Sequence, residues 1–266
     1  MKIPQTPGDW NEWRPWLAAR GSELKTALLF STRLPLPFPH VAAAGGAGIG
    51  EAAWALPLAG LVVGLIGGAI YALAERLGVP AFPAAALALT ATLAATGALH
   101  EDGLADTVDG FGGGETREQK LAIMRDARIG AYGVCALIVS ILIRAGVVAS
   151  FAHSAAAVWA LLAAHGAARA AMPLLMFFVA PARSDGLSFT AGRPSAENTA
   201  AAAIIGLLIL IAGLGFVGAI EAAVLLAVVI VLMARLSEQQ IGGQTGDVLG
   251  ALEQAGEIVI LLVAAR

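Results

Sequence analysis

The chain has 266 residues, of which 58% are hydrophobic and only 13% are charged, and its mean hydropathy is +0.80. Because a soluble domain carries about 25% charged residues, this composition excludes a soluble globular protein and a disordered one. The formal net charge of −3 excludes a nucleic-acid partner. A single cysteine, Cys135, excludes an intrachain disulfide. We therefore expect an integral membrane protein that is embedded in a lipid bilayer.

Residues 1–21 mix basic and acidic side chains with tryptophans at every third position, Trp10, Trp13 and Trp16. Tryptophan beside basic residues is typical of the headgroup region of a bilayer. The segment lacks the apolar stretch that is typical of a cleavable signal peptide. We expect an interfacial helix within residues 1–21, with an unstructured tail as the alternative. Residues 22–266 are predicted to form the integral membrane domain, which carries the candidate catalytic residues.

Seven later segments are apolar enough to cross a membrane, which takes about 20 residues. They are Trp54–Leu77, Val79–Leu99, Ala131–Phe151, Ser154–Ala180, Thr199–Ala219, Ala222–Leu236 and Val248–Ala264. The last is the weakest because Glu253 and Glu257 interrupt it. Ser22–Phe38 is apolar but short, and prolines end it, so it is predicted to be a half-inserted or surface element. The expected fold class is all-α, a polytopic transmembrane bundle of about seven spans.

The basic residues orient these spans. With seven crossings, twelve of the sixteen Lys and Arg side chains fall on one side of the membrane, and the other side has only Arg76 and Arg266. Cytoplasmic loops carry the excess of Lys and Arg. The N-terminus is therefore predicted to be cytoplasmic, together with the polar loops His100–Gly130 and Ser237–Asp247. An active site that faces the cytoplasm follows.

The first of these loops contains the stretch His100-Glu-Asp-Gly-Leu-Ala-Asp-Thr-Val-Asp-Gly110. On a helix, Asp102, Asp106 and Asp109 fall at positions i, i+4 and i+7 and share one face. Like charges at this spacing destabilise a helix, and the low dielectric of a neighbouring bilayer strengthens their repulsion. A bound cation relieves it, and oxygen ligands of this kind favour Mg²⁺. The alternative is a solvated acidic turn.

Basic residues follow in the same loop. The stretch Thr116-Arg-Glu-Gln119 has the form of a capping box that begins a short helix, after which Arg125 and Arg128 flank Asp126. Arginine binds phosphate oxygens through two donors, and Mg²⁺ bridges the same oxygens. The combination therefore favours a diphosphate substrate. The alternative is that these cations only set the topology of the chain.

A second polar element, Gly242-Gly-Gln-Thr-Gly-Asp247, leads directly into the last apolar segment. Its glycines allow a ligand to approach the backbone, and the following helix places Asp247 at an N-terminus. Such a motif is often only a turn. Its place on the same predicted membrane face as the aspartates favours a contact with substrate through Gln244 and Asp247.

Several ionisable side chains lie within the predicted spans. Arg169 follows His165 by four residues on one helix, and Glu257 follows Glu253 by four on another. Because charges inside a membrane are usually paired, we predict an ion pair between Arg169 and one of the two glutamates. Arg144 has no evident partner in the sequence.

Three stretches together resemble the signature motifs of the cobalamin synthase family, also called adenosylcobinamide-GDP ribazoletransferases. They are His100–Gly110 as quoted above, Ile123-Met-Arg-Asp-Ala-Arg-Ile-Gly130 and Gly242-Gly-Gln-Thr-Gly-Asp-Val-Leu-Gly-Ala251. The resemblance runs from about Ser22 to Ala264. The chain departs from the family pattern at Glu101, Val108 and Ala127, and these departures remove no carboxylate and no arginine.

The resemblance implies an enzyme of the bacterial inner membrane that uses Mg²⁺. It would join adenosylcobinamide-GDP to α-ribazole, or to its 5′-phosphate, and release GMP. We assign the residues accordingly: Asp102, Asp106 and Asp109 to Mg²⁺, Arg125 and Arg128 to the diphosphate, and His100, Gln244 and Asp247 to substrate. Asp126 is the predicted general base, with Asp247 as the alternative, and Asp109 is a further catalytic residue.

Two other functions are open at this point. A CDP-alcohol phosphotransferase that makes a phospholipid would use similar aspartates, although its pattern has an Ala-Arg pair where this chain has Thr107-Val108. A cation transporter could use the acidic stripe as a filter, but transporters often contain internal repeats, and we find none here. The oligomeric state stays open, a homo-oligomer included.

Overall fold

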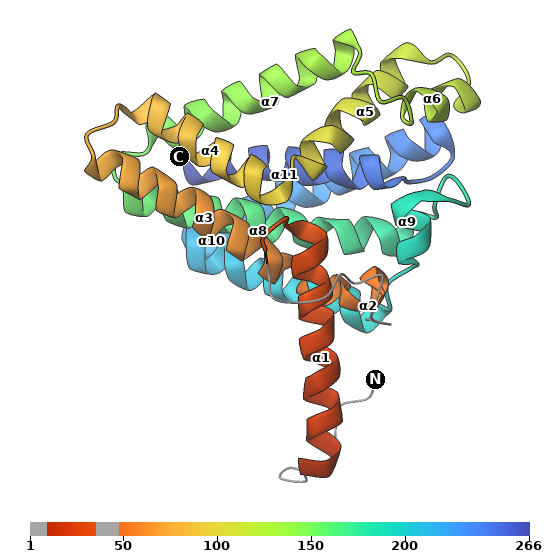
Figure 1. Ribbon diagram of the computed structural model, residues 1–266, viewed down its shortest axis with the longest axis horizontal. Coiled ribbons are helices and arrows are strands. Elements are labelled where there is room, and N and C mark those ends of the chain that lie inside the picture. The colour runs from red at the N-terminus through yellow and green to blue at the C-terminus, as the bar shows by residue number, and fades with distance from the viewer. Residues whose placement is uncertain (1–9, 36–47) are drawn as a thin grey trace.

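The computed structural model describes residues 10–35 and 48–266, and helices account for almost all of the regular structure in these ranges (Figure 1). The helices are α1 (Trp10–Ser31), α2 (Ile49–Ala52), the 3₁₀-helix η2 (Ala53–Ala55), α3 (Leu56–Arg76), α4 (Ala81–Thr96), α5 (Leu99–Gly113), α6 (Arg117–Ile123), α7 (Ala131–Ser150), α8 (Ser154–Phe178), α9 (Gly186–Ala191), α10 (Ala196–Ile241) and α11 (Gly246–Ala264). Pro181 and Gln244 pair as an isolated β-bridge. The predicted all-α class is confirmed.

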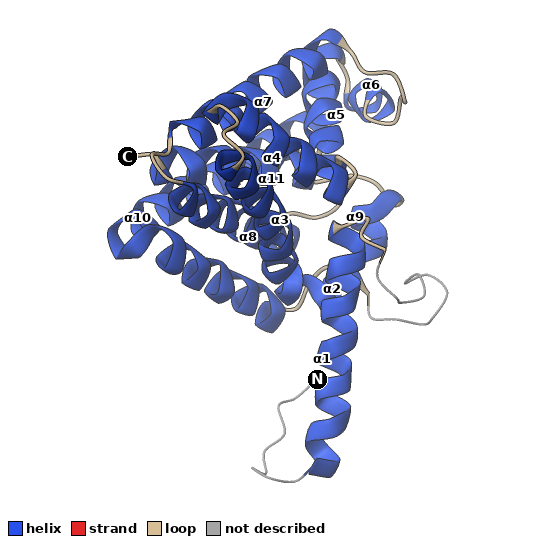
Figure 2. Ribbon diagram, turned by 60° about the vertical axis from the view of Figure 1, so that its left-hand side comes forward, coloured by secondary structure: helices blue, strands red, loops and turns tan. Residues whose placement is uncertain are grey.

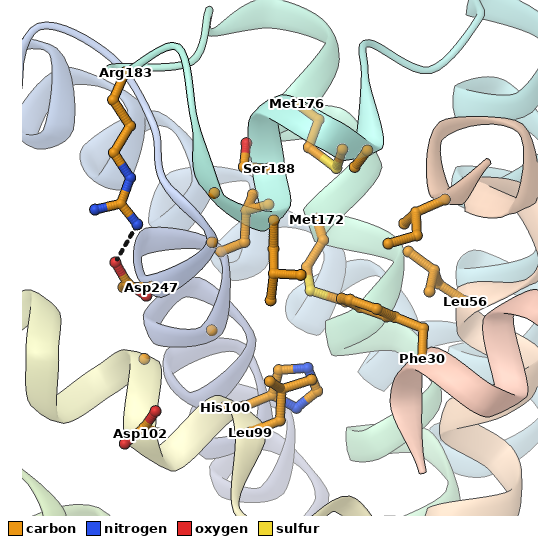
Figure 3. A pocket seen from close by; sticks show the side chains of 18 residues that line it. Phe30, Leu56, Leu99, His100, Asp102, Met172, Met176, Arg183, Ser188 and Asp247 are labelled. Atoms are coloured by element: carbon orange, nitrogen blue, oxygen red, sulfur yellow. Dashed lines mark ion pairs between the residues drawn. The ribbon is translucent and has the colours of Figure 1, made fainter. Parts of the chain in front are cut away.

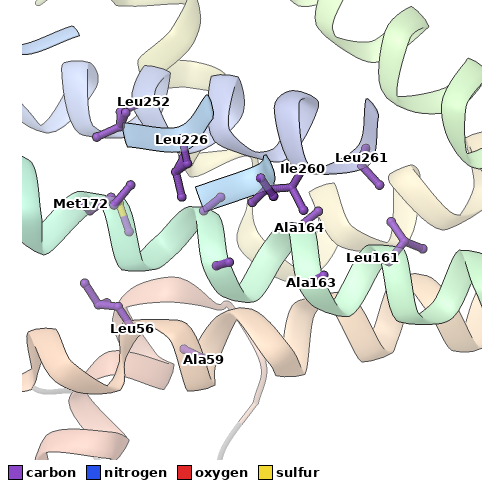
Figure 4. Packing of buried hydrophobic residues seen from close by; sticks show 14 of the residues in the cluster. Leu56, Ala59, Leu161, Ala163, Ala164, Met172, Leu226, Leu252, Ile260 and Leu261 are labelled. Carbon is purple, nitrogen blue, oxygen red and sulfur yellow. The ribbon is translucent and has the colours of Figure 1, made fainter. Parts of the chain in front are cut away.

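Helix α8 forms the centre of the bundle and packs against α3, α10 and α11. In an apolar stretch of 18 residues of α8, 78% of the residues are buried, whereas the corresponding share is 28% in α7 and 17% in α10. Small residues make this possible, because alanines on several faces of α8 let neighbouring helices approach closely. Figure 4 shows Ala163 and Ala164 of α8 between the side chains of α3 and α11. The core therefore consists mainly of small side chains, with larger residues such as Leu161 and Ile260 filling the spaces between them.

Helices α3 and α8 make the closest of these contacts through the glycine pattern in α3. A Cβ added at Gly64 would lie 2.6 Å from the carbonyl oxygen of Leu161, and one added at Gly68 would lie 3.1 Å from the side chain of Val158. Gly60, Gly64 and Gly68 recur at every fourth position of α3, which is the small-xxx-small spacing that lets two helices pack closely.

The second predicted span, Val79–Leu99, corresponds to α4 and ends in a sharp bend. Helices α4 and α5 meet at an angle of 90°, because Gly97 and Ala98 both adopt left-handed backbone conformations, with φ of 68° and 57°. Alanine rarely adopts this conformation, so Ala98 is held there by the surrounding fold. The bend turns the polar helix α5 away from the line of α4 and carries its aspartates toward one end of the bundle (Figure 1).

Helix α10 reverses direction within its 46 residues. Gly215 is non-helical, with φ of 70° and ψ of 178°. Before it, Gly206 lies against Ala170 of α8 and Gly213 lies against Ala163, whereas after it Leu226 contacts Gly256 of α11 beside Ala168. The chain therefore runs along α8 and returns, as two antiparallel arms. These arms correspond to the fifth and sixth predicted spans, with the turn a few residues earlier than predicted.

Four helical segments are long and apolar enough to cross a membrane: Ile49–Arg76, Ala131–Ser150, Ser154–Phe178 and Ala196–Ile241. The bent pair of α4 and α5 makes a fifth if it counts as one span. These helices bear out a membrane protein. At the N-terminus, α1 contains all three tryptophans and continues as one helix through the predicted boundary at residues 21 and 22, and it projects away from the bundle (Figures 1 and 2).

A pair of glycine substitutions tests the α3–α8 seam. Gly64→Ala should lower the free energy of unfolding by about 1–3 kcal/mol, because the added methyl group overpacks the seam. Gly146→Ala in α7 is the matched control: nothing lies within 4 Å of its added Cβ, so it should be neutral or stabilise by up to about 1 kcal/mol. Thermal unfolding in detergent measures both, and equal effects of the two changes would contradict the packing described.

Candidate active site

The acidic helix α5 directs its carboxylates in two directions. Asp102 is exposed and Asp106 is half-buried, whereas Glu101 and Asp109 are buried, each about 7% exposed. Helix α11 crosses α5 at Gly103, where an added Cβ would lie 3.1 Å from the Cα of Asp247. This close approach, which only a glycine allows, places Asp247 beside Asp102 and Asp106. The structure thus brings together three carboxylates, Asp102, Asp106 and Asp247, from two helices that are far apart in the sequence. We call this set the carboxylate cluster.

The pKa of Asp106 reflects this crowding. It is raised from its ordinary value of 3.8 to about 7, first because burial disfavours the charged form and then because Asp102 and Asp247 are nearby. Burial likewise raises the pKa of Asp247. These two carboxyl groups lie in the polar segments at the end of the bundle and not within an apolar span. Buried carboxyl groups whose pKa values are shifted in this way are candidates for a functional site.

Asp109 has a different environment. Its carboxylate accepts hydrogen bonds from the backbone N–H groups of Gly130 (2.7 Å) and Gly133 (2.9 Å). Asp109 therefore caps the N-terminus of α7, where a negative charge is stabilised by the helix dipole. The structure brings Asp102 and Asp106 together with Asp247, and it engages Asp109 with backbone. The metal and catalytic roles assigned to Asp109 stay predictions.

Arg183 is a site residue that the sequence analysis missed. It lies between α8 and α9, and its Nη2 is 3.6 Å from Oδ2 of Asp247 (Figure 3). It faces Asp247, and its positive charge partly offsets the rise that burial causes in the pKa values of Asp106 and Asp247. In the sequence, Arg183 counted only among the basic residues that orient the spans. Its place two residues after Pro181, at the end of a long apolar span, was the feature that could have marked it as a candidate.

The predicted phosphate-binding arginines are paired with carboxylates. Arg125 donates to both oxygens of Asp185, at 2.6 and 2.8 Å, and so joins the loop after α6 to the loop before α9. Arg128 binds Asp126 through its guanidinium and its backbone N–H, which lowers the pKa of Asp126 to about 2. A carboxylate with so low a pKa is a weak proton acceptor near pH 7. The roles of these residues stay predictions.

Gln244 has a structural environment in this arrangement. Its side-chain oxygen accepts a hydrogen bond from Ser188 of α9 (2.6 Å), and its backbone pairs with Ala180 and Ala182. The next residue, Thr245, caps α11 by accepting from the N–H of Val248. Gln244 thus fixes α9 and the start of α11 relative to each other. Its predicted contact with substrate stays a prediction.

A cavity of about 260 Å³ opens beside the carboxylate cluster (Figure 3). Asp102, Asp247 and Arg183 line one end, and apolar side chains line the other. The apolar lining includes Phe30 of α1, Leu56 of α3, Met172 and Met176 of α8 and Leu249 of α11. His100 lies at the floor of the cavity between these two regions. One cavity therefore combines a charged end with an apolar end.

Behind this cavity, a network of charged residues is buried among α5, α7, α8 and α11. Its ion pairs are Arg169–Glu253 (2.5 Å), Arg144–Glu257 (2.9 Å), Arg144–Glu101 (3.1 Å) and His165–Glu257. The predicted pair between Arg169 and a glutamate is confirmed. Arg144, for which the sequence shows no evident partner, pairs with Glu101 and Glu257, which are 43 and 113 residues away, so no local pattern reveals them.

His165, Glu253 and Glu257 place their ligand atoms within 4.8 Å of one another, the spacing of a metal site within the described ranges. Arg144 and Arg169 already neutralise both glutamates at hydrogen-bonding distance. A further cation there would meet two guanidinium groups, so this trio serves the ion-pair network and does not fit a metal.

Comparisons with known proteins bear on the whole chain. Residues 23–265 match the family model described as cobalamin-5-phosphate synthase. A Bradyrhizobium diazoefficiens protein named adenosylcobinamide-GDP ribazoletransferase is 53% identical over 92% of this chain and 93% of its own length. Proteins of the same name from Mesorhizobium japonicum (51%; 91% and 92%) and Brucella ovis (39%; 89% and 93%) also align along most of both chains. No solved structure matches the chain.

The raised pKa of Asp106 predicts a pH dependence of stability. In the unfolded chain this carboxyl ionises near pH 4, whereas in the folded protein it ionises near pH 7, so the folded state binds the extra proton between these values. Stability without divalent metal should therefore fall as the pH rises from 5 to 8. Thermal unfolding in detergent with a chelator measures this fall, which Asp106→Asn should reduce. Parallel pH profiles for the two proteins would contradict the shift.

Proposed function

The chain belongs to the cobalamin-5-phosphate synthase family, and from that premise we propose that it transfers the adenosylcobinamide phosphate group of adenosylcobinamide-GDP to α-ribazole or its 5′-phosphate. The relatives named above carry this activity in their names. The observation that carries the proposal at the level of the site is the set of Asp102, Asp106 and Asp247, of which Asp102 and Asp247 line the charged end of the cavity together with Arg183.

The transfer is a substitution at phosphorus. A ribose hydroxyl of the acceptor attacks the phosphorus that is attached to cobinamide, the bond from this phosphorus to the bridging oxygen of the diphosphate breaks, and GMP leaves. Enzymes accelerate such reactions mainly by positioning the reactants and by neutralising charge. A site with anionic groups on one side and an arginine on the other provides both.

We propose Asp102 and Asp106 as the direct ligands of Mg²⁺, with Asp247 beside them. The donor set fits, because Mg²⁺ is commonly held by one or two carboxylates and by substrate phosphates, and Asp102 and Asp247 lie close enough to Asp106 to add to the effect of burial in raising its pKa. When bound, Mg²⁺ neutralises the oxygens of the diphosphate. Arg183 lies within reach of the same region and is placed to bind a phosphate oxygen.

Asp247 is the better placed of the two candidate bases. It lines the cavity, and burial raises its pKa toward the working range of a general base. Asp126 is engaged with Arg128, and its pKa of about 2 disfavours proton uptake. We therefore propose that Asp247 accepts the proton of the attacking hydroxyl. Arg125, which pairs with Asp185 in this structure, is placed to exchange that partner for the diphosphate of the incoming donor.

We also propose the topology of the chain. If the two arms of α10 count separately, α4 counts as the second predicted segment with α5 bent away from its end, and α11 counts as the last, the chain has the seven predicted segments. The loops that carry α6 and α9 lie at the C-terminal end of α8, since Arg117 binds the carbonyl of Ala182. The Arg76 end of α3 lies beyond Gly68, which packs at Val158 near the start of α8. The excess of basic residues at the α6–α9 end supports a cytoplasmic site in the bacterial inner membrane.

An assay with purified protein in detergent tests the activity. Adenosylcobinamide-GDP, α-ribazole and Mg²⁺ should yield GMP, and Asp106→Asn should reduce its rate by about 10²–10³-fold, the loss typical of removing a group that stabilises developing charge. Glu221→Gln, at an exposed acid of α10, is the control and should retain the rate. Activity on a CDP-alcohol with no release of GMP from adenosylcobinamide-GDP would favour the phospholipid alternative, and cation flux without either reaction would favour the transporter.

Cysteine labelling tests the topology. In a Cys135→Ser background, Glu118→Cys on α6 and Leu77→Cys after α3 introduce exposed thiols at opposite ends of the bundle. An impermeant maleimide added to cells with a permeable outer membrane should label Leu77→Cys at once and Glu118→Cys only after the inner membrane is opened. The reverse order of labelling would contradict the proposed orientation.

A further inference from the structure

We propose that the apolar end of the cavity, with His100, binds the planar aromatic base of the riboside acceptor and recognises its unprotonated ring nitrogen. This inference rests on the proposed function, because it assigns one substrate of that reaction to one part of the site. It divides the cavity into a base subsite, formed by Phe30, Leu56, Met172, Met176 and His100, and a charged end.

The size of the cavity limits what can occupy it. At about 260 Å³, it is slightly smaller than the range of about 300–1,000 Å³ that is typical for drug-sized ligands. A bicyclic base and part of its sugar fit into such a space. The corrin macrocycle of the donor does not, so it must remain outside the cavity, and the smaller substrate is the one to be enclosed.

The lining favours an apolar aromatic base. Phe30 presents a ring, and Met172 and Met176 present thioethers, which make favourable contacts with aromatic edges (Figure 3). The guanine of the donor is a poor occupant, because its carbonyl, ring N–H and exocyclic amino group would be left unpaired against these side chains. A benzimidazole, the base of α-ribazole, has only one polar ring atom that is not bonded to the sugar.

His100 supplies a donor for that one atom. Its Nδ1 lies 3.2 Å from Nη2 of Arg169, and a guanidinium group can only donate. Oε2 of Glu253 lies farther from the same nitrogen, at 3.4 Å, so we take the shorter contact with Arg169 as the hydrogen bond, which makes Nδ1 the acceptor and leaves the proton of the neutral ring on Nε2. Nε2 is buried and has no hydrogen-bond partner among the residues that the structure describes. Because His100 is 3% exposed and lines the cavity, an acceptor nitrogen on a bound base would satisfy this orphaned donor.

The two ends of the cavity then orient the acceptor. With the base among Phe30, Met172 and His100, its sugar extends toward Asp102 and Asp247, which line the opposite end (Figure 3). The ribose hydroxyls thus point to the proposed base and to the phosphate-binding residues. The same arrangement explains why an apolar cavity adjoins a group of carboxylates.

Equilibrium binding in detergent tests this subsite without requiring turnover. The probes are α-ribazole and the corresponding indole riboside, in which a C–H replaces the acceptor nitrogen. The wild-type protein should bind α-ribazole about tenfold more tightly, the usual effect of one neutral hydrogen bond. Equal dissociation constants, or no binding of α-ribazole, would overturn the proposal. Displacement of α-ribazole by guanosine at similar concentrations would overturn the choice of base.

Variants separate the two features of the subsite. His100→Leu should bind both ribosides with the lower affinity of the indole riboside, and His100→Gln, which keeps an N–H donor, should restore part of the preference. Met172→Phe should weaken binding of both ribosides about tenfold by filling the cavity, whereas the same change at Met233, which lies on α10 and does not line the cavity, should leave it unchanged. Unaltered affinity in a folded Met172→Phe protein would place the base elsewhere.

Release of GMP, measured in parallel, keeps the two claims distinct. Selective riboside binding without release of GMP would retain the subsite and reject the proposed transfer. Release of GMP with no preference for α-ribazole over the indole riboside would retain the transfer and reject the subsite.

Discussion

The structure depends on the ion pair between Arg169 of α8 and Glu253 of α11, in the middle of an apolar bundle. Neither charge is tolerable there alone, because an unpaired buried charge costs several kcal/mol. Their side chains are at most 1% exposed and lie 2.5 Å apart. Through Glu257 the pair extends to Arg144 of α7, and through Arg144 to Glu101 of α5. Four helices are thereby fixed in one register, which small apolar side chains alone would specify poorly.

This register determines where the candidate site forms. Glu101 enters the buried network, so the next residue, Asp102, must face a different direction on the same helix, and it reaches the cavity. His100 is held by Arg169 on one nitrogen and faces the cavity with its ring. The close crossing of α5 and α11 at Gly103 and Gly250 adds Asp247. Residues that stabilise the bundle and residues proposed to act on substrate therefore alternate along a single turn of α5.

Much of this arrangement is predictable from the sequence, because the bilayer imposes strong local rules. Apolar length predicts the helices, the i, i+4 spacing predicts the shared face of Asp102 and Asp106, and the cost of buried charge predicts a partner for Arg169. Other features depend on contacts between distant segments. Arg144 finds its partners on two other helices, Asp109 caps a helix 21 residues away, and Arg183 meets Asp247 only after α8, α9 and α11 have packed. The reversal lies at Gly215, a few residues before the predicted division at residues 220 and 221, because one glycine among other glycines and apolar residues gives no distinct signal.

The central claim is that phosphoryl transfer takes place between the carboxylates of α5 and α11 and the arginine that follows α8. A cryo-EM structure of the protein with Mg²⁺ and a non-hydrolysable analogue of adenosylcobinamide-GDP tests it most directly. We predict density for the diphosphate between Arg183 and the side chains of Asp102 and Asp106, with the corrinoid outside the cavity. Diphosphate density away from these residues, for example at the buried trio of His165, Glu253 and Glu257, would contradict the account.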